Sequence, residues 1–256
     1  MSKNVLITGS TSGIGLGIAK SFAKAGYNIV FNGLETNGAD IAAEIAKEYG
    51  VKTFFHGANL LFPDQIEDLF LQATTTIGNI DILVNNAGIQ YVAPIDEFPV
   101  EKWNQIIGIN LTSAFHTSRL VWKGMKAAGW GRIINIASAH GLVASEFKSA
   151  YVSAKHGLLG LTKTLALEGA TCGIRVNAIC PGYVKTPLVE KQIADQAKTH
   201  NIPESEVIST ILLAKQPIKD FVTVEDLGAM SVFLCSENSN LFTGSIISMD
   251  GGWSAQ

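Results

Sequence analysis

The chain has 256 residues, of which 47% are hydrophobic and 16% are charged. This composition provides for a sizeable core and excludes a disordered protein. A net charge of -3, with Lys and Arg dispersed along the chain, gives no electrostatic basis for binding nucleic acid. The sequence has no apolar run near the ~18 residues of a membrane span, and no signal peptide precedes Val5–Ile7. We therefore expect a cytoplasmic protein that forms a single domain over residues 1–256.

The cysteines and histidines predict no metal site. Cys172, Cys180 and Cys235 form no CxxC pair, and an odd number without ligand spacing fits reduced thiols in a cytosol. The five histidines are scattered along the chain. We expect no bound metal.

Short apolar runs alternate with helical patterns along most of the chain. The first run, Val5–Thr8, predicts a buried strand, and the spacing of Ile14, Ile18 and Phe22 predicts an amphipathic helix after it. Six more strands are predicted at 28–31, 53–55, 81–84, 133–136, 174–179 and 245–248, with helices at 38–49, 63–77, 100–125 and 224–235 and a further one carrying Tyr151. The alternation predicts an α/β fold, a doubly wound parallel sheet of seven strands with helices on both faces.

Two helical segments have no strand partner near them. They are Thr186–His200 and Pro203–Ala214, and together they suggest a lid over about 186–215. An ordinary surface insertion fits the same pattern equally well.

A glycine-rich turn, Gly9-Ser10-Thr11-Ser12-Gly13-Ile14-Gly15, joins the first strand to the first helix. Glycines allow the backbone to approach a pyrophosphate, and the start of the helix offers free N–H groups. A merely tight turn would look similar. The strand before and the helix after are the setting that a dinucleotide site requires.

The end of the second strand bears on the choice between NAD and NADP. An acid at this place often binds the adenosine ribose hydroxyls, but here Gly33 and Leu34 stand there. No arginine is present to accept a 2′-phosphate, so we predict NAD. Glu35 either reaches the ribose or is a solvated loop residue.

A candidate catalytic group lies between Ser138 and Lys155. Tyr151 and Lys155 are four residues apart, which places them on one helix face. A nearby ammonium is expected to lower the pKa of a tyrosine, making it an acid or base at cellular pH. Ser138 follows the strand 133–136, at the edge where such sheets bind ligands. The spacing YxxxK alone also occurs by chance in many chains.

Asn110 lies among apolar residues of the pattern at 100–125. It is either a satisfied core amide or part of a site, and both interpretations require hydrogen-bond partners around it.

Taken together, these motifs resemble the short-chain dehydrogenase/reductase family over essentially the whole chain. The resemblance rests on TGSTSGIG at 8–15, NNAG at 85–88, Asn110, Ser138, YVSAK at 151–155 and PG at 181–182, in the family's order. It implies a Rossmann-like fold, hydride transfer with NAD(P) and a homotetramer.

The resemblance also implies residue roles. Tyr151 is the acid/base, Lys155 holds the nicotinamide ribose and lowers the pKa of the tyrosine, Ser138 binds the reacting oxygen, and Asn110 helps a proton-relaying water chain. The implied cofactor-binding residues are Gly9, Thr11, Ser12, Gly13, Ile14, Gly15, Leu34, Asn59, Leu60, Asn86, Ala87, Gly88, Tyr151, Lys155, Pro181, Gly182, Val184 and Thr186.

Lys148 and His140 suggest an anionic substrate. Lys148 comes one turn before Tyr151, near the helix start, where the helix dipole disfavours a cation. With His140 it could clamp a carboxylate, while Gln90 and Gln192 could add neutral donors. A surface lysine with its head in water is the equally weighted alternative.

This pattern is similar to the group within the family that oxidises (R)-3-hydroxybutyrate to acetoacetate with NAD. The matching segments are 85–90, 138–145, Lys148, 154–157, 186–193 and 250–256. The similarity implies that Gln90, His140, Lys148 and Gln192 bind the substrate carboxylate and that Trp253 packs near the pocket. Tyr183 departs from the group, which usually has tryptophan there, so it changes the size and polarity of the pocket wall.

Other functions remain open from the sequence. A 3-oxoacyl thioester reductase or a sugar-alcohol dehydrogenase would use the same fold, but a thioester carries no free carboxylate next to the reacting carbon, and that class often prefers NADP. A dinucleotide sensor without catalysis often loses the tyrosine or lysine, and both are present here.

Overall fold

The computed structural model describes residues 2–186, 189–190, 193–194, 197–198 and 201–255. Its centre is one parallel sheet of seven strands in the order β3-β2-β1-β4-β5-β6-β7. The strands are β1 (Asn4–Ile7), β2 (Asn28–Asn32), β3 (Thr53–His56), β4 (Ile82–Asn85), β5 (Gly131–Ile136), β6 (Ile174–Pro181) and β7 (Ile246–Met249). The order reverses between β1 and β4, so a crevice forms at the carboxyl ends of these neighbours. The predicted doubly wound fold is confirmed.

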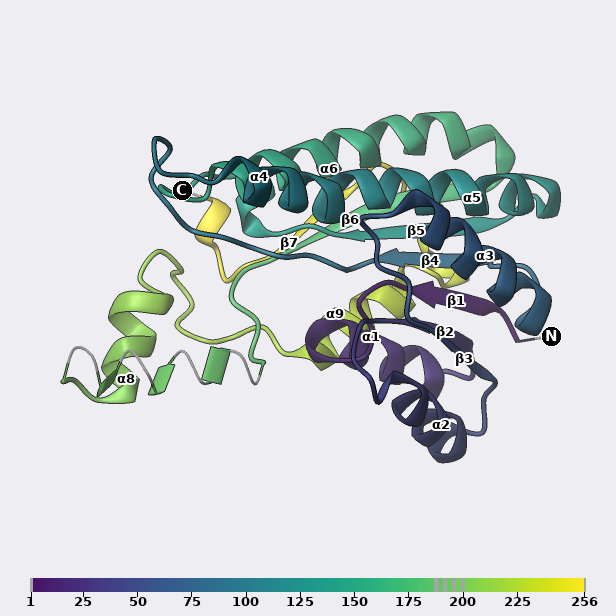
Figure 1. Cartoon of the computed structure of the whole chain (residues 1–256), viewed down its shortest axis with the longest axis horizontal. Coiled ribbons are helices and arrows are strands. Elements are labelled where there is room, and N and C mark those ends of the chain that lie inside the picture. The colour runs from purple at the N-terminus through teal and green to yellow at the C-terminus, as the bar shows by residue number, and fades with distance from the viewer. Residues whose placement is uncertain (1, 187–188, 191–192, 195–196, 199–200, 256) are drawn as a thin grey trace.

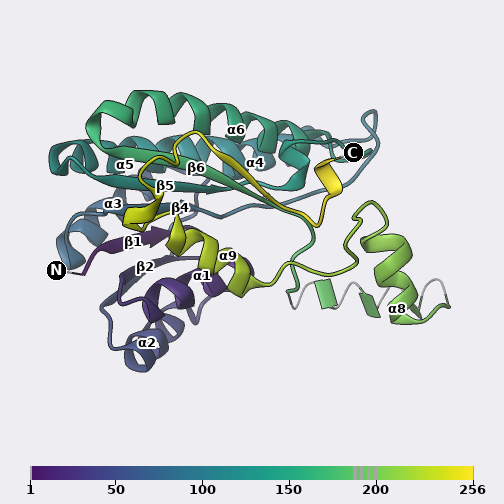
Figure 2. The same ribbon diagram turned by 180° about the vertical axis from the view of Figure 1, so that it is seen from behind.

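Helices cover both faces of this sheet. Figures 1 and 2 show α1 (Gly13–Lys24), α2 (Gly38–Tyr49) and α9 (Val224–Phe233) on one side. The other side carries α3 (Pro63–Ile77), α4 (Val100–Ile107), α5 (Ser113–Ala128) and α6 (Ser149–Gly169). Strands β1, β4 and β5 are buried throughout, as expected when helices cover both faces of a parallel sheet.

The long helix predicted at 100–125 is present but not uniform. Between α4 and α5 the backbone forms a π-helical turn over Gly108–Thr112. Asn110 lies in this turn, with its side chain buried. Single π-turns of this kind often occur at functional sites.

The predicted lid region lies between β6 and α9 in the chain, and its residues from 201 onward project from the body of the molecule (Figure 1). Its described part contains α8 (Glu204–Glu206) followed by a π-helical turn, Val207–Leu212. Gln192, a predicted substrate-binding residue, lies outside the described residues.

No helix in the described part of the chain is both long and apolar enough to cross a bilayer. All three cysteines are free.

Candidate active site

Ser138, Tyr151 and Lys155 meet at one cavity of about 1050 Å³. Ser138 follows the end of β5, and the other two side chains project from α6. The Nζ atom of Lys155 is buried and donates a hydrogen bond of 2.7 Å to the carbonyl oxygen of Ile136. It lies 5.7 Å from the centre of the Tyr151 ring. The strand end and the helix therefore hold a hydroxyl, a phenol and an amine around one space.

Burial governs the protonation of this group. The pKa of Tyr151 is raised, chiefly by burial, although a hydrogen bond with Ser138 lowers it. The expected lowering of this pKa by Lys155 is not found, because burial raises the pKa and Lys155 is not among its causes. Burial also lowers the pKa of Lys155 to about 8, which leaves the amine mostly protonated at neutral pH.

Asn110 has the partners that both interpretations required. Its Oδ1 accepts a hydrogen bond from the backbone N–H of Ile89, and its Nδ2 donates to the Ile89 carbonyl, both at 2.9 Å. This paired contact fixes the segment after β4 that borders the cavity. The π-helical turn supplies the backbone shift that places the amide there.

The glycine-rich turn has the shape of a phosphate cradle. Gly9 and Gly13 have φ angles of 60° and 51°, which disfavour other residues. A Cβ atom on Gly15 would lie 2.1 Å from the Gly9 carbonyl oxygen, whereas one on Gly13 would meet nothing within 4 Å. The backbone around Gly15 therefore leaves no room for a side chain, whereas the space beside Gly13 is open.

The helix that follows leaves its first N–H groups for a ligand. Ser12, the N-cap of α1, makes no capping hydrogen bond with its side chain. The Nδ2 atom of Asn86 donates to the carbonyl oxygens of Thr8 and Gly9, at 2.9 and 3.0 Å, and so joins the end of β4 to this turn. These features fit the pyrophosphate of a dinucleotide.

Glu35 is exposed to solvent, yet its carboxylate is tied to this turn. Its carboxylate accepts one hydrogen bond from Thr11 Oγ1 and another, of 3.0 Å, from Ser12 Oγ. The Thr11 hydrogen bond is the main reason why the pKa of Glu35 lies below its usual value. A Cβ atom on Gly33 would lie 2.0 Å from Thr11 Oγ1, so the usual position for an acid has no room for a side chain.

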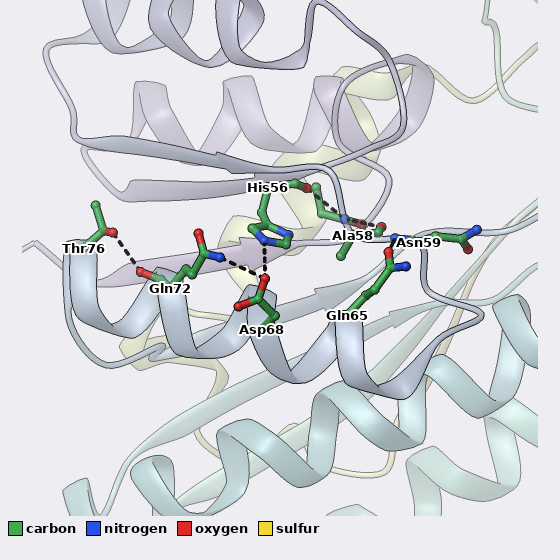
Figure 3. A network of polar contacts seen from close by, with 8 residues as sticks. His56, Ala58, Asn59, Gln65, Asp68, Gln72 and Thr76 are labelled. Carbon is green, nitrogen blue, oxygen red and sulfur yellow. Dashed lines mark hydrogen bonds and ion pairs between the residues drawn. The ribbon is translucent and has the colours of Figure 1, made fainter.

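The segment predicted to flank the adenine is tied to α3 (Figure 3). Gln65 Oε1 accepts a hydrogen bond of 2.8 Å from the backbone N–H of Asn59. Further along α3, Asp68 pairs with His56 at 3.2 Å and with Gln72 at 2.9 Å. These contacts fix the end of β3 and the Asn59–Leu60 segment relative to the helix.

Aromatic rings form part of the wall of the cavity. Tyr183 stacks on Trp253 with ring centres 6.0 Å apart, and His140 packs edge-on against Trp253 at 5.0 Å and against Tyr151 at 5.9 Å. The pKa of His140 is lowered to about 4, mainly by burial and then by the charges of Lys148 and Lys215. The imidazole is therefore neutral at physiological pH.

Lys148 supplies positive charge at this wall. It is the N-cap of α6, where the helix dipole disfavours a cation, and it lines the same cavity as Tyr151. Burial and then the charge of Lys215 lower its pKa. The ion pairs of the described residues do not include Lys148. An anion entering the cavity would relieve this unfavourable arrangement.

Many of the predicted residues share this one cavity. It is lined by the predicted residues Ile14, Asn86, Gly88, Gln90, Ser138, His140, Lys148, Tyr151, Lys155, Pro181, Gly182, Tyr183, Val184, Thr186 and Trp253. Other predicted residues, including Leu34, Asn59 and Leu60, do not line it. Sequence reasoning missed several lining residues, among them Tyr91, Val92, Val189 and Leu212, because apolar loop and lid residues carry no motif.

Among the described residues, no group of three or more His, Cys, Asp or Glu side chains could hold a metal ion.

Comparisons with known proteins identify full-length bacterial relatives. The chain is 54% identical over its full length to the D-beta-hydroxybutyrate dehydrogenase of Rhizobium meliloti (strain 1021), with all of that protein covered. It is 55% identical to the protein of the same name from Cupriavidus necator, with 99% of this chain and 98% of that protein covered.

A solved structure gives the same fold. L-sorbose reductase from Gluconobacter frateurii, in complex with NADPH and L-sorbose, matches with a TM-score of 0.95 at 32% identity, covering 100% of this chain and 97% of that one. The family model described as short chain dehydrogenase matches residues 3–197. The chain belongs to the short-chain dehydrogenase family.

Proposed function

We propose that this protein is an oxidoreductase that interconverts (R)-3-hydroxybutyrate and acetoacetate with NAD. The observation that carries the proposal is Lys148, a cation without an ion-pair partner among the described residues, in the same cavity as Tyr151. A small 3-hydroxy acid would place its carboxylate at Lys148 and its hydroxyl at Tyr151. The names of the two bacterial relatives support this substrate.

In this proposal the side chains of the protein transfer the proton and stabilise the charges that arise in the reaction. Tyr151 removes the hydroxyl proton of the substrate while Ser138 donates a hydrogen bond to the reacting oxygen. Lys155 keeps a positive charge beneath the site. The glycine-rich turn and the start of α1 would hold the pyrophosphate of a nicotinamide dinucleotide, which would supply the hydride acceptor. His140 contributes as a neutral hydrogen-bonding group, and Gln90 as a neutral donor.

The preference for NAD over NADP rests on Glu35. Its carboxylate, hydrogen-bonded to Thr11 and Ser12, carries negative charge beside the glycine-rich turn. The ribose hydroxyls of NAD can donate hydrogen bonds to a carboxylate, whereas a carboxylate would repel the 2′-phosphate of NADP. The L-sorbose reductase structure contains NADPH, so the fold alone does not decide this choice.

The location of the enzyme, its assembly and its lid are part of the same proposal. We place the enzyme in the cytoplasm, in keeping with its free cysteines, and we propose a homotetramer as in the family it resembles. We propose that the segment 186–215 acts as a lid, because two of its described residues, Val189 and Leu212, line the cavity.

The decisive test combines a substrate panel with a charge deletion. We expect NADH formation with 3-hydroxybutyrate to exceed that with sugar alcohols and with 3-hydroxyacyl thioesters. Lys148→Ala should lower kcat/KM for 3-hydroxybutyrate by about tenfold or more, because a charge-assisted contact contributes roughly 1.5–3 kcal/mol.

The matched control is Lys163→Ala, which removes an exposed lysine from the same helix. Its kinetics should equal those of the wild type. Tyr151→Phe should nearly abolish turnover while NADH still binds. Equal activity on uncharged alcohols, or wild-type kinetics of Lys148→Ala, would refute the proposed substrate.

A further inference from the structure

His140 is held between two serine hydroxyls. Its Nδ1 lies 3.5 Å from Ser138 Oγ, and its Nε2 lies 3.0 Å from Ser145 Oγ. The backbone N–H of His140 also donates to Ser138 Oγ at 3.1 Å, which fixes the near end of this arrangement. Both ring nitrogens therefore face a group that can donate and accept a proton.

The imidazole is neutral in this setting, so one ring nitrogen carries a hydrogen and the other accepts one. Burial holds the pKa of His140 at about 4. A neutral ring between two hydroxyls can accept a proton on one nitrogen and release one from the other without becoming an imidazolium. Ser138 and Tyr151 line the same cavity, and the Ser138 hydroxyl lowers the pKa of the phenol, so Ser138 connects His140 with Tyr151.

The groups Ser138, His140 and Ser145 extend from the active-site cavity to a second cavity. Ser145 lines a second cavity, of about 540 Å³, together with Ala144, Glu146, Phe147 and Lys215. The two cavities share no lining residue. Apart from Ser145, the residues around the second cavity are exposed, so water reaches it. His140 lines the first cavity and contacts the second through Ser145.

We propose that Ser138, His140 and Ser145 form a proton path between Tyr151 and water in the second cavity. This inference rests on the proposed role of Tyr151 as the base. After Tyr151 has taken the substrate proton, its O–H bond breaks as a proton passes to Ser138 Oγ. Ser138 gives its own hydrogen to His140 Nδ1, and the hydrogen on Nε2 passes to Ser145 Oγ.

Ser145 then releases its original hydrogen to water. Each group along the path loses one proton and gains one, Tyr151 can again accept a proton, and one proton reaches solvent. The imidazole regains its first tautomer by exchange with water after the product leaves. In the reduction direction the same steps run in reverse and deliver a proton to Tyr151.

The test follows proton release and hydride transfer in the same single turnover. A pH indicator reports the proton, and NADH absorbance reports the hydride, with 3-hydroxybutyrate and NAD as reactants. In the wild type we expect the two signals to rise together. In Ser145→Ala the proton signal should lag behind NADH, and kcat should fall about tenfold, part of the ~10²–10⁴-fold that positioned proton transfer supplies.

Two further variants separate a relay from a structural role. Ser145→Thr keeps a hydroxyl and should restore the simultaneous signals, and Ser153→Ala, on an exposed position of α6, should behave as the wild type. A structural role for Ser145 would slow both signals equally, and that result would overturn the path. So would simultaneous signals at the wild-type rate in Ser145→Ala. Oxidation of 3-hydroxybutyrate by that variant would at the same time uphold the proposed function.

Discussion

Glu35 lies two residues beyond the place where dinucleotide folds usually carry their acid. Thr11 Oγ1 fills the space in which a side chain on Gly33 would have to stand. The same hydroxyl then serves as a donor to Glu35. A displaced acid thus restores the negative charge that the strand end lacks, and it does so through a contact between two separate segments.

Glu35→Gln is expected to weaken the preference for NAD. The amide keeps the size of the side chain and one acceptor oxygen but removes the charge that opposes a 2′-phosphate. Because Glu35 is exposed and its field is screened by salt, we expect a gain in kcat/KM with NADP of about tenfold, equivalent to ~1.4 kcal/mol. Steady-state kinetics with both cofactors measure it.

Glu44→Gln on α2, another exposed acid, is the matched control and should leave the ratio of NAD to NADP activity unchanged. An unaltered ratio in Glu35→Gln would contradict the assignment of Glu35 to cofactor choice.

Helices α1 and α9 lie side by side (Figures 1 and 2), and a glycine permits their close approach. A Cβ atom on Gly17 of α1 would lie 2.4 Å from Val224 Cβ of α9. Val224 is the first residue of its helix, and a capping box between Thr223 and Asp226 fixes that end. Neither helix can therefore move away without breaking contacts.

Gly17→Ala should destabilise the protein by about 1–3 kcal/mol, the usual cost of overpacking. Gly124→Ala on α5 is the matched control, because a Cβ atom there meets nothing within 4 Å. That variant should gain roughly 0.5–1 kcal/mol from helix propensity. Urea denaturation at an unchanged m-value measures both free energies. Equal effects of the two substitutions would contradict the packing argument.

At the level of elements, the sequence pattern predicted most of the structure. The predicted and observed bounds of α2 and α3 coincide, and the strands differ by a few residues at their ends. Apolar periodicity determines such elements directly. The π-helical turn at Asn110 could not be predicted, because it depends on where that amide meets the backbone of Ile89.

Part of the candidate site could likewise be predicted from the sequence, and part of it could not. Ser138, Tyr151 and Lys155 meet because the end of a parallel strand and the helix that follows it lie at the same sheet edge. Their convergence was predictable from order and spacing. The contacts of Ser145 with His140 and of Glu35 with Thr11 join loops whose paths depend on the whole fold. The printed sequence carries no periodic pattern for them.

The outer surface of the molecule has an apolar patch formed by Phe233, Leu241 and Phe242. Phe233, at the end of α9, and Phe242 contact each other edge to face at 5.5 Å. The Leu241 side chain beside them is 95% exposed. Grouped apolar side chains of this kind are typical of surfaces that associate with another chain. We expect the proposed homotetramer to cover this patch with a second copy of the chain.

Leu241→Asp should therefore split the assembly. A charge buried between two copies without a partner would cost several kcal/mol, enough to favour smaller species. Light scattering after gel filtration should give about four times 27.3 kDa for the wild type and a lower mass for this variant. The control is Leu71→Asp on α3, an equally apolar residue, 63% exposed and outside the patch, which should keep the wild-type mass. A wild-type mass for Leu241→Asp would exclude the patch as an interface, and a monomeric wild type would refute the tetramer itself.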